Sequence, residues 1–154
     1  MKRIAFFLLI FLSSNLVYPS TLKERLDWLE KKFVETDKIV QEDFELVKTH
    51  FILLLDAGIR KEDVFAIFNY LLREDLDIVE QMAVLKELSL TVARHDVGSK
   101  ALRNLVSGAI KRGRVEGLDN EELAAYLIAE LRTFKPEERY KRTPYKLINT
   151  PVQR

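Results

Sequence analysis

The sequence contains no cysteine, and it holds only five glycines and four prolines among its 154 residues. The missing cysteine excludes disulfides, thiolate metal sites, thiol nucleophiles and a lipidated N-terminal cysteine. The few turn-forming residues, together with many Leu, Glu, Lys and Ala residues, favour helices over a set of short strands. With 47% hydrophobic and 32% charged residues, the composition is typical of one globular domain with its own core.

The first twenty residues have the pattern of an export signal. Lys2 and Arg3 precede an apolar stretch of nine residues, Ile4–Leu12, and polar, turn-forming residues follow. The apolar stretch is shorter than the roughly 20 residues that span a bilayer. Residues 1–20 are therefore predicted to be a signal peptide, and the protein to be exported, periplasmic or secreted. Because Leu12 and Tyr18 are not the small residues that a cleavage site needs, an uncleaved N-terminus anchored to the membrane is the alternative.

The charges are nearly balanced overall but unevenly distributed. Without residues 1–20 the chain carries 23 basic and 24 acidic side chains, so its net charge of −1 does not favour nucleic acid. Residues 21–98 hold 17 acids and 11 bases, whereas residues 99–154 hold 7 acids and 12 bases. The resulting charges of −6 and +5 suit docking within the molecule, head-to-tail association into a homo-oligomer, or an anionic partner for the C-terminal half.

Apolar residues at helical spacing predict an all-α domain over residues 21–134, a compact bundle of five or six helices built from helical hairpins. A capping box at Thr21 starts the first helix. Its apolar stripe continues to Leu54, as one long helix or as two helices separated near residues 35–38, with Asp37 as a cap for the second. Gly58 is expected to end the stripe, because glycine accepts the left-handed conformation of a helix C-terminus.

Four more helices are predicted after Gly58. Helices over 61–73 and from Asp119 to about 132 are apolar almost all round, so both are expected to be buried in one core. A helix from Asp75 or Asp77 to about 94 and another over 100–112 lie between them, separated by a loop at 95–99. Residues 135–154 contain three prolines and no periodicity, which predicts a flexible basic tail.

Two segments of the sequence, 57–73 and 116–132, resemble each other. They align without gaps and are identical at the positions of Gly58, Glu62, Ala66, Leu72 and Arg73. Each identity lies where a helical hairpin needs it, for example the glycine at a helix end and the glutamate in a first turn. The similarity indicates either a duplication or repeated use of one rule for ending and starting helices, and the spacing fits no common repeat.

Metal-binding patterns are absent from the sequence, and no cofactor is expected. His50 has apolar residues at i±3 and i±4, so it is expected to be partly buried with its hydrogen bonds satisfied. Three acidic clusters could suggest acid–base or calcium chemistry, but all fall at predicted helix starts, where capping and the helix dipole favour carboxylates. These clusters are Glu62–Asp63, Glu74–Asp77 and Asp119–Glu122.

The main candidates for a binding site are basic residues. Four of them follow at i, i+3, i+11 and i+14 on one predicted helix, opposite its apolar face, and the tail adds more with tyrosines between them. They form either a solvated surface or a site for an anionic partner, such as phospholipid headgroups, an acidic polymer or an acidic protein. The candidate residues are Lys100, Arg103, Lys111, Arg114, Arg139, Tyr140, Lys141, Arg142 and Tyr145.

These observations predict a non-enzymatic, exported helical protein that acts as an interaction or structural protein of the cell envelope. Its partner would be an unknown protein or an anionic envelope surface, and no nucleic acid is expected. One alternative is a small hydrolase that uses His95, Asp96 and one of Ser89, Ser99 and Ser107, although no G-x-S-x-G elbow is present. The other is a carrier that holds an apolar ligand in an internal cavity between the two apolar helices.

Overall fold

The computed structural model describes residues 20–136, and this part of the chain is entirely helical, as predicted. Of the expected signal peptide, 1–20, and the expected tail, 135–154, residues 1–19 and 137–154 lie outside the described residues. The helices are α2 (Leu22–Phe33), α3 (Gln41–Asp56), α4 (Lys61–Arg73), α5 (Ile78–His95), α6 (Ser99–Val115) and α7 (Asn120–Thr133).

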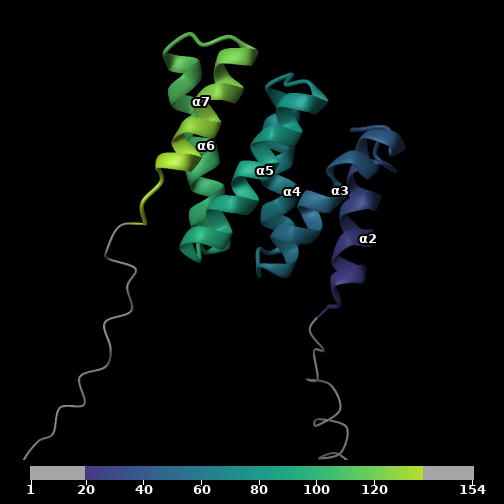
Figure 1. Cartoon of the computed structure of the whole chain (residues 1–154). Helices are drawn as coiled ribbons and strands as arrows, with labels where there is room; N and C mark the ends of the chain where they lie inside the picture. Colours follow the sequence, from purple (N-terminus) through teal and green to yellow (C-terminus); the bar gives the residue numbers. More distant parts are fainter. Residues whose placement is uncertain (1–19, 137–154) are drawn as a thin grey trace, which may run out of the picture.

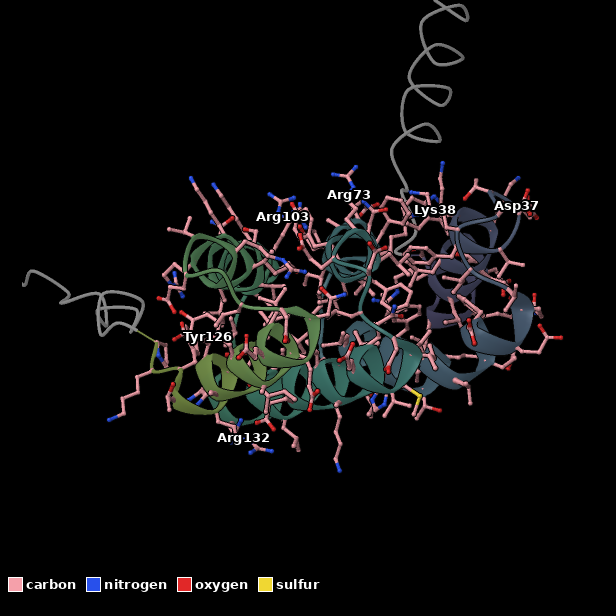
Figure 2. The ribbon with its side chains drawn as sticks, turned by 90° about the horizontal axis from the view of Figure 1, so that it is seen from above. Asp37, Lys38, Arg73, Arg103, Tyr126 and Arg132 are labelled. Carbon is pink, nitrogen blue, oxygen red and sulfur yellow. The ribbon has the colours of Figure 1, made fainter. Side chains whose placement is uncertain are left out.

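The six helices pair into three hairpins, α2/α3, α4/α5 and α6/α7, which stand side by side in a row (Figure 1). Viewed along the helices, α2, α4 and α6 form one layer, and α3, α5 and α7 form the other (Figure 2). Each hairpin packs mainly on its neighbour in the row. This is the arrangement of α-solenoids, in which helix pairs stack and bury a continuous core between two layers.

The core lies between the layers and is richest in aromatic side chains at the α2/α3 end. Phe33, Phe51 and Phe68 are fully buried. The ring of Phe33 lies 5.9 Å from that of Phe51 and 5.1 Å from that of Phe68. α4 packs against α2 and α6 in its own layer and against α3 and α5 in the other. Its position explains why its sequence is apolar on almost every side.

Capping boxes fix three of the six helix starts in the described part of the chain. Thr21, Asp77 and Asp119 each form a capping box with the glutamate three residues later, as their sequences predict. The first apolar stripe is divided into α2 and α3, but the predicted cap at Asp37 is wrong. Asp37 has a left-handed backbone with φ of 54° inside the turn, and α3 begins after Val40 without a side-chain cap.

The two similar sequence segments end their preceding helices in the same way. Gly58 and Gly117 have φ of 89° and 79°, a region that glycine enters without steric cost. The next residues, Ile59 and Leu118, donate their N–H groups to carbonyls five positions earlier, which is the Schellman motif. However, α4 and α7 belong to different layers. The two similar segments therefore do not occupy equivalent places in the stack.

Candidate functional site

The four candidate cations of α6 separate into two kinds. Lys100 and Lys111 are exposed, whereas Arg103 and Arg114 are half-buried and turned towards α4. The prediction that all four lie opposite the apolar face is therefore wrong for the two arginines. Arg103 forms an ion pair with Asp63 of α4, and Arg114 forms one with Glu74, the residue after α4. These ion pairs indicate a structural role for both arginines.

Asp63 is the partner of Arg103, and it is fully buried. Its carboxylate lies 3.0 Å from Nη1 of Arg103 and 2.6 Å from Nη2 of Arg60. A buried carboxylate without cations loses its hydration and destabilises the fold by several kcal/mol, or about 3–5 kcal/mol when one partner of a pair is removed. Asp63 is thus more than the helix-start acid that its sequence position indicates, because Arg60 and Arg103 together place positive charge beside this buried carboxylate.

Arg114 joins the ends of α4, α6 and α7. Its Nε donates to the carboxylate of Glu74 at 2.7 Å, and its Nη2 donates to the Glu74 carbonyl at 3.1 Å and to Oδ1 of Asn120 at 2.8 Å. Its Nη1 donates to the carbonyl of Leu118 at 2.8 Å. With these acceptors the guanidinium group is nearly saturated, because it has five N–H donors. Arg114 therefore holds a corner of the fold together.

The two ion pairs define how α4 and α6 lie against each other. Asp63 and Glu74 are separated by 11 residues, and so are Arg103 and Arg114, and both pairs are 40 residues apart in sequence. Equal spacing in the same direction means that the two helices are parallel neighbours in register. Figure 2 shows Arg103 on the outer side of this layer, together with Arg73 of α4.

Three exposed cations without an ion pair in the described part of the chain lie on the outer side of α4 and α6. Within residues 20–136, Arg73, Lys100 and Lys111 form no ion pair. We call the exposed side of α4 and α6 that carries these three residues the basic surface. A groove of about 520 Å³ runs between the two helices there, with Arg73 and Lys111 beside the apolar side chains of Ile110 and Val115.

A larger groove of about 1230 Å³ lies at the α6/α7 end of the stack, and we call it the end groove. It is lined by the end of α5, the loop to α6, the start of α6 and the residues after α7. Lys100 lies on this groove, and so do His95, Asp96 and Ser99. The ring of His95 packs edge-on against Phe134, with 6.0 Å between the ring centres.

Within residues 20–136, the three serines considered for hydrolase chemistry form hydrogen bonds with backbone groups and not with His95. Ser99 shares the end groove with His95 and Asp96, but its hydroxyl accepts the N–H of Arg60 at 2.9 Å. The other two hydroxyls donate to carbonyls of their own helices, three or four residues earlier. Among the described residues, no hydrogen bond joins any of them to His95, whereas a nucleophile–base pair has such a bond at about 2.6–3.2 Å. The two serines with helical acceptors are Ser89 and Ser107.

His50 lies on α3 beside α5 and is partly buried, as predicted. Its Nδ1 has no hydrogen-bond partner among the described residues, so the expectation that it is satisfied is wrong. Burial lowers the pKa of His50 below its ordinary value, and the nearby charge of Lys86 lowers it further. The folded protein thus favours the neutral imidazole.

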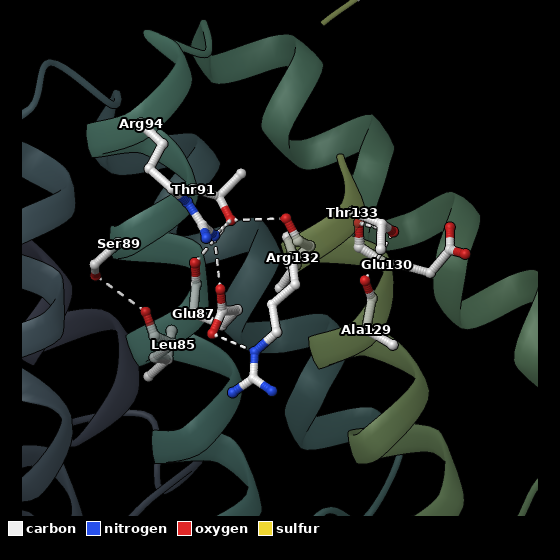
Figure 3. Close-up of polar contacts among 10 residues, drawn as sticks. Leu85, Glu87, Ser89, Thr91, Arg94, Ala129, Glu130, Arg132 and Thr133 are labelled. Carbon is white, nitrogen blue, oxygen red and sulfur yellow. Dashed lines mark hydrogen bonds and ion pairs between the residues drawn. The ribbon is translucent and has the colours of Figure 1, made fainter. Parts of the chain in front are cut away.

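A polar cluster that the sequence did not indicate joins α5 to α7 (Figure 3). Glu87 is only 5% exposed and accepts hydrogen bonds from Arg94 at 2.6 Å and from Arg132 at 3.1 Å. The buried hydroxyl of Thr91 adds a bond to the Leu131 carbonyl at 3.2 Å. Burial raises the pKa of Glu87, but the bonds from the two arginines outweigh it and leave the pKa below its ordinary value.

Other predicted functions find limited support in the described part of the chain. No group of three or more His, Asp or Glu residues in positions 20–136 could hold a metal ion. The hollows of about 520, 590 and 1230 Å³ are grooves open to solvent, whereas a carrier of an apolar ligand needs an enclosed cavity.

No described helix is long and apolar enough to cross a membrane. The tail candidates Arg139, Tyr140, Lys141, Arg142 and Tyr145 lie outside the described residues.

Comparison with known proteins leaves the site to be interpreted from its own geometry. No protein-family model, no curated protein and no solved structure significantly matches this chain.

Proposed function

We propose that this chain is a non-enzymatic interaction protein of the cell envelope that binds an anionic partner through its basic surface. The observation that carries the proposal is the division of the α6 cations. Arg103 and Arg114 are needed to hold α6 on α4, whereas Lys100 and Lys111 are exposed and form no ion pair within residues 20–136. Arg73 adds a third such cation on the neighbouring helix.

The position of Lys100 supports a role outside the fold. It lies in the first turn of α6, where the helix dipole disfavours a cation by about 0.3–1 kcal/mol. The positive charge of Lys100 therefore does not stabilise α6. By contrast, Arg73, Arg112 and Arg114 lie in last turns, where the dipole favours them, so their charges have a structural explanation as well.

Replacement of Lys100 separates binding from folding. In Lys100→Glu the new carboxylate suits the helix start, so we expect the urea unfolding midpoint to stay the same or rise. Binding to an anionic partner should fall, because one cation of the basic surface has become an anion. The matched control is Lys23→Glu, because Lys23 is exposed and is the second residue of α2, as Lys100 is of α6.

The readout is chemical crosslinking in the source cell, followed by mass spectrometry of the products from full-length wild type, Lys100→Glu and Lys23→Glu. We expect at least one acidic partner to be recovered with wild type and Lys23→Glu, and to be depleted about tenfold with Lys100→Glu. Equal recovery of every partner from all three proteins would refute the proposed role of the basic surface.

Export is the second part of the proposal, and the pattern of residues 1–20 supports it. The intact mass of the native protein in separated cell fractions tests it. A mass short by about twenty residues in the soluble envelope fraction is the expected result. A full-length mass in the membrane fraction would favour the alternative of an uncleaved anchor, and a full-length mass in the cytosol would contradict export.

A further inference from the structure

The end groove has an apolar floor. Three segments that are far apart in the sequence contribute to this floor: Val97 from the α5–α6 loop, Leu105 from α6, and Phe134 after α7. Val97 is 7% exposed, and the other two are half-buried. A floor of this kind can take up a large apolar side chain, whose burial contributes about 1.5–3 kcal/mol.

The rim of the end groove carries lysines from two segments that are far apart in the sequence. Lys100 comes from α6, and Lys135 comes from the segment after α7. Lys100 and Lys135 form no ion pair with any residue in positions 20–136, whereas Arg94 on the same rim is held by Glu87. Asp96 is the one acid among the lining residues that the structure describes. Cations from separate segments therefore surround the apolar floor.

We propose that the end groove binds an acidic segment of a partner protein, with one large apolar side chain of that segment seated on the floor and carboxylates beside the rim cations. This inference rests on the proposed function, because Lys100 belongs to both the basic surface and the groove. It adds the chemical nature of the partner: acidic residues on both sides of an apolar anchor.

The shape of the groove favours a protein segment over a fatty acid or a single lipid. Small-molecule sites bury most of the surface of their ligand in an enclosed pocket, whereas this groove is open to solvent. A fatty acid brings one carboxylate, whereas the groove offers Lys100 and Lys135 from separate segments. A chain that crosses the groove brings several carboxylates, and main-chain groups of the segment remain in contact with water.

Two fluorescein-labelled peptides test the inference on the full-length protein by fluorescence polarisation. One has three glutamates on each side of a phenylalanine, and the other has serine in place of the phenylalanine. We expect the phenylalanine peptide to bind about tenfold more tightly, as the burial of one aromatic side chain implies. Ala101→Trp should remove this preference, because Ala101 is exposed and lines the groove, so the indole would occupy the floor.

Ala129→Trp is the control for Ala101→Trp, since Ala129 is an exposed helical alanine on α7 outside the groove lining. It should leave the tenfold preference unchanged. Equal binding of the two peptides, or a preference that survives Ala101→Trp, overturns the inference. If binding is then still weakened by Lys100→Glu, the proposed function stands without it. Binding only to vesicles of anionic phospholipid, with neither peptide bound, also overturns the inference.

Discussion

His50 shows how one side chain links stability to pH. Its imidazole lies between α3 and α5, near Lys86, and its Nδ1 has no partner in the described structure. Because burial and Lys86 lower the pKa of His50 in the folded state, the unfolded chain binds more protons below the ordinary pKa of 6.5. The contribution of His50 to stability is thus fully present above pH 6.5 and is lost as the pH falls below that value.

We therefore expect the urea concentration at the unfolding midpoint of the wild type to decrease as the pH is lowered from 8 to 5.5. In His50→Gln this fall should be smaller, because glutamine does not titrate. Lys86→Gln should reduce the fall in part, since it removes the nearby positive charge but not the burial. Identical pH profiles of the wild type and His50→Gln would show that His50 does not cause the dependence.

At the scale of single helices, α6 contains two glycines with opposite surroundings. A Cβ at Gly108 would meet only Arg112 Nη1, at 3.4 Å, whereas a Cβ at Gly113 would lie 2.7 Å from Leu123 Cδ1 and 3.3 Å from Leu118 Cδ1. Leu123 is fully buried, so it cannot move aside without disturbing the core. Gly113 thus allows α6 and α7 to approach closely, and Gly108 has no such role.

The substitutions Gly108→Ala and Gly113→Ala should consequently change stability in opposite directions. Alanine at position 108 should raise the free energy of unfolding by about 0.5–1 kcal/mol, because alanine favours the helix more than glycine does. Alanine at position 113 should lower it by about 1–3 kcal/mol through overpacking. Urea denaturation of both variants measures the difference, and a gain in stability at position 113 would contradict the close packing of α6 on α7.

The individual helices could be predicted well because their signals are local. The bounds of α4, Lys61–Arg73, agree with the prediction, and Asp77 and Asp119 cap their helices as expected. Asp37 was predicted wrongly because the same residue type that caps helices also adopts left-handed turns, and sequence alone does not separate these uses. α6 extends to Val115, three residues beyond the predicted end.

The arrangement of the helices and the composition of the site were less predictable, because they depend on contacts between distant residues. The role of Arg103 follows only once α4 and α6 are known to be neighbours, since its partner Asp63 is 40 positions away. A signal was present in the sequence, namely the same spacing of 11 residues between Asp63 and Glu74 and between Arg103 and Arg114. The Glu87 cluster carries no comparable pattern.

At the scale of the whole molecule, the hairpins differ in how many neighbours support them. α4/α5 lies between the other two hairpins, whereas α2/α3 and α6/α7 each have one neighbour within the described stack. In such stacks the free energy of unfolding is close to the sum of the intrinsic stabilities of the repeats and the energies of the interfaces between neighbouring repeats. The central hairpin should therefore be the last part to open.

Native-state hydrogen exchange read by mass spectrometry measures this order. We expect the slowest amide exchange in α4 and α5 and earlier exchange in α2 and at the end of α7, where fewer interfaces must break. Low concentrations of urea should widen the difference between the hairpins. Exchange at one common rate throughout residues 20–136 would instead show that the stack opens only as a single unit.

The register of α6 on α4 has a further consequence for recognition. Lys100 and Lys111 are also 11 residues apart, and the paired arginines between and beyond them prevent α6 from sliding or turning. At 1.5 Å per residue, the two lysines are held about 16.5 Å apart along a rigid axis. An extended chain covers that distance in about five residues. The proposed binding of an anionic partner therefore predicts a preference for acidic groups about this far apart over closer or wider ones.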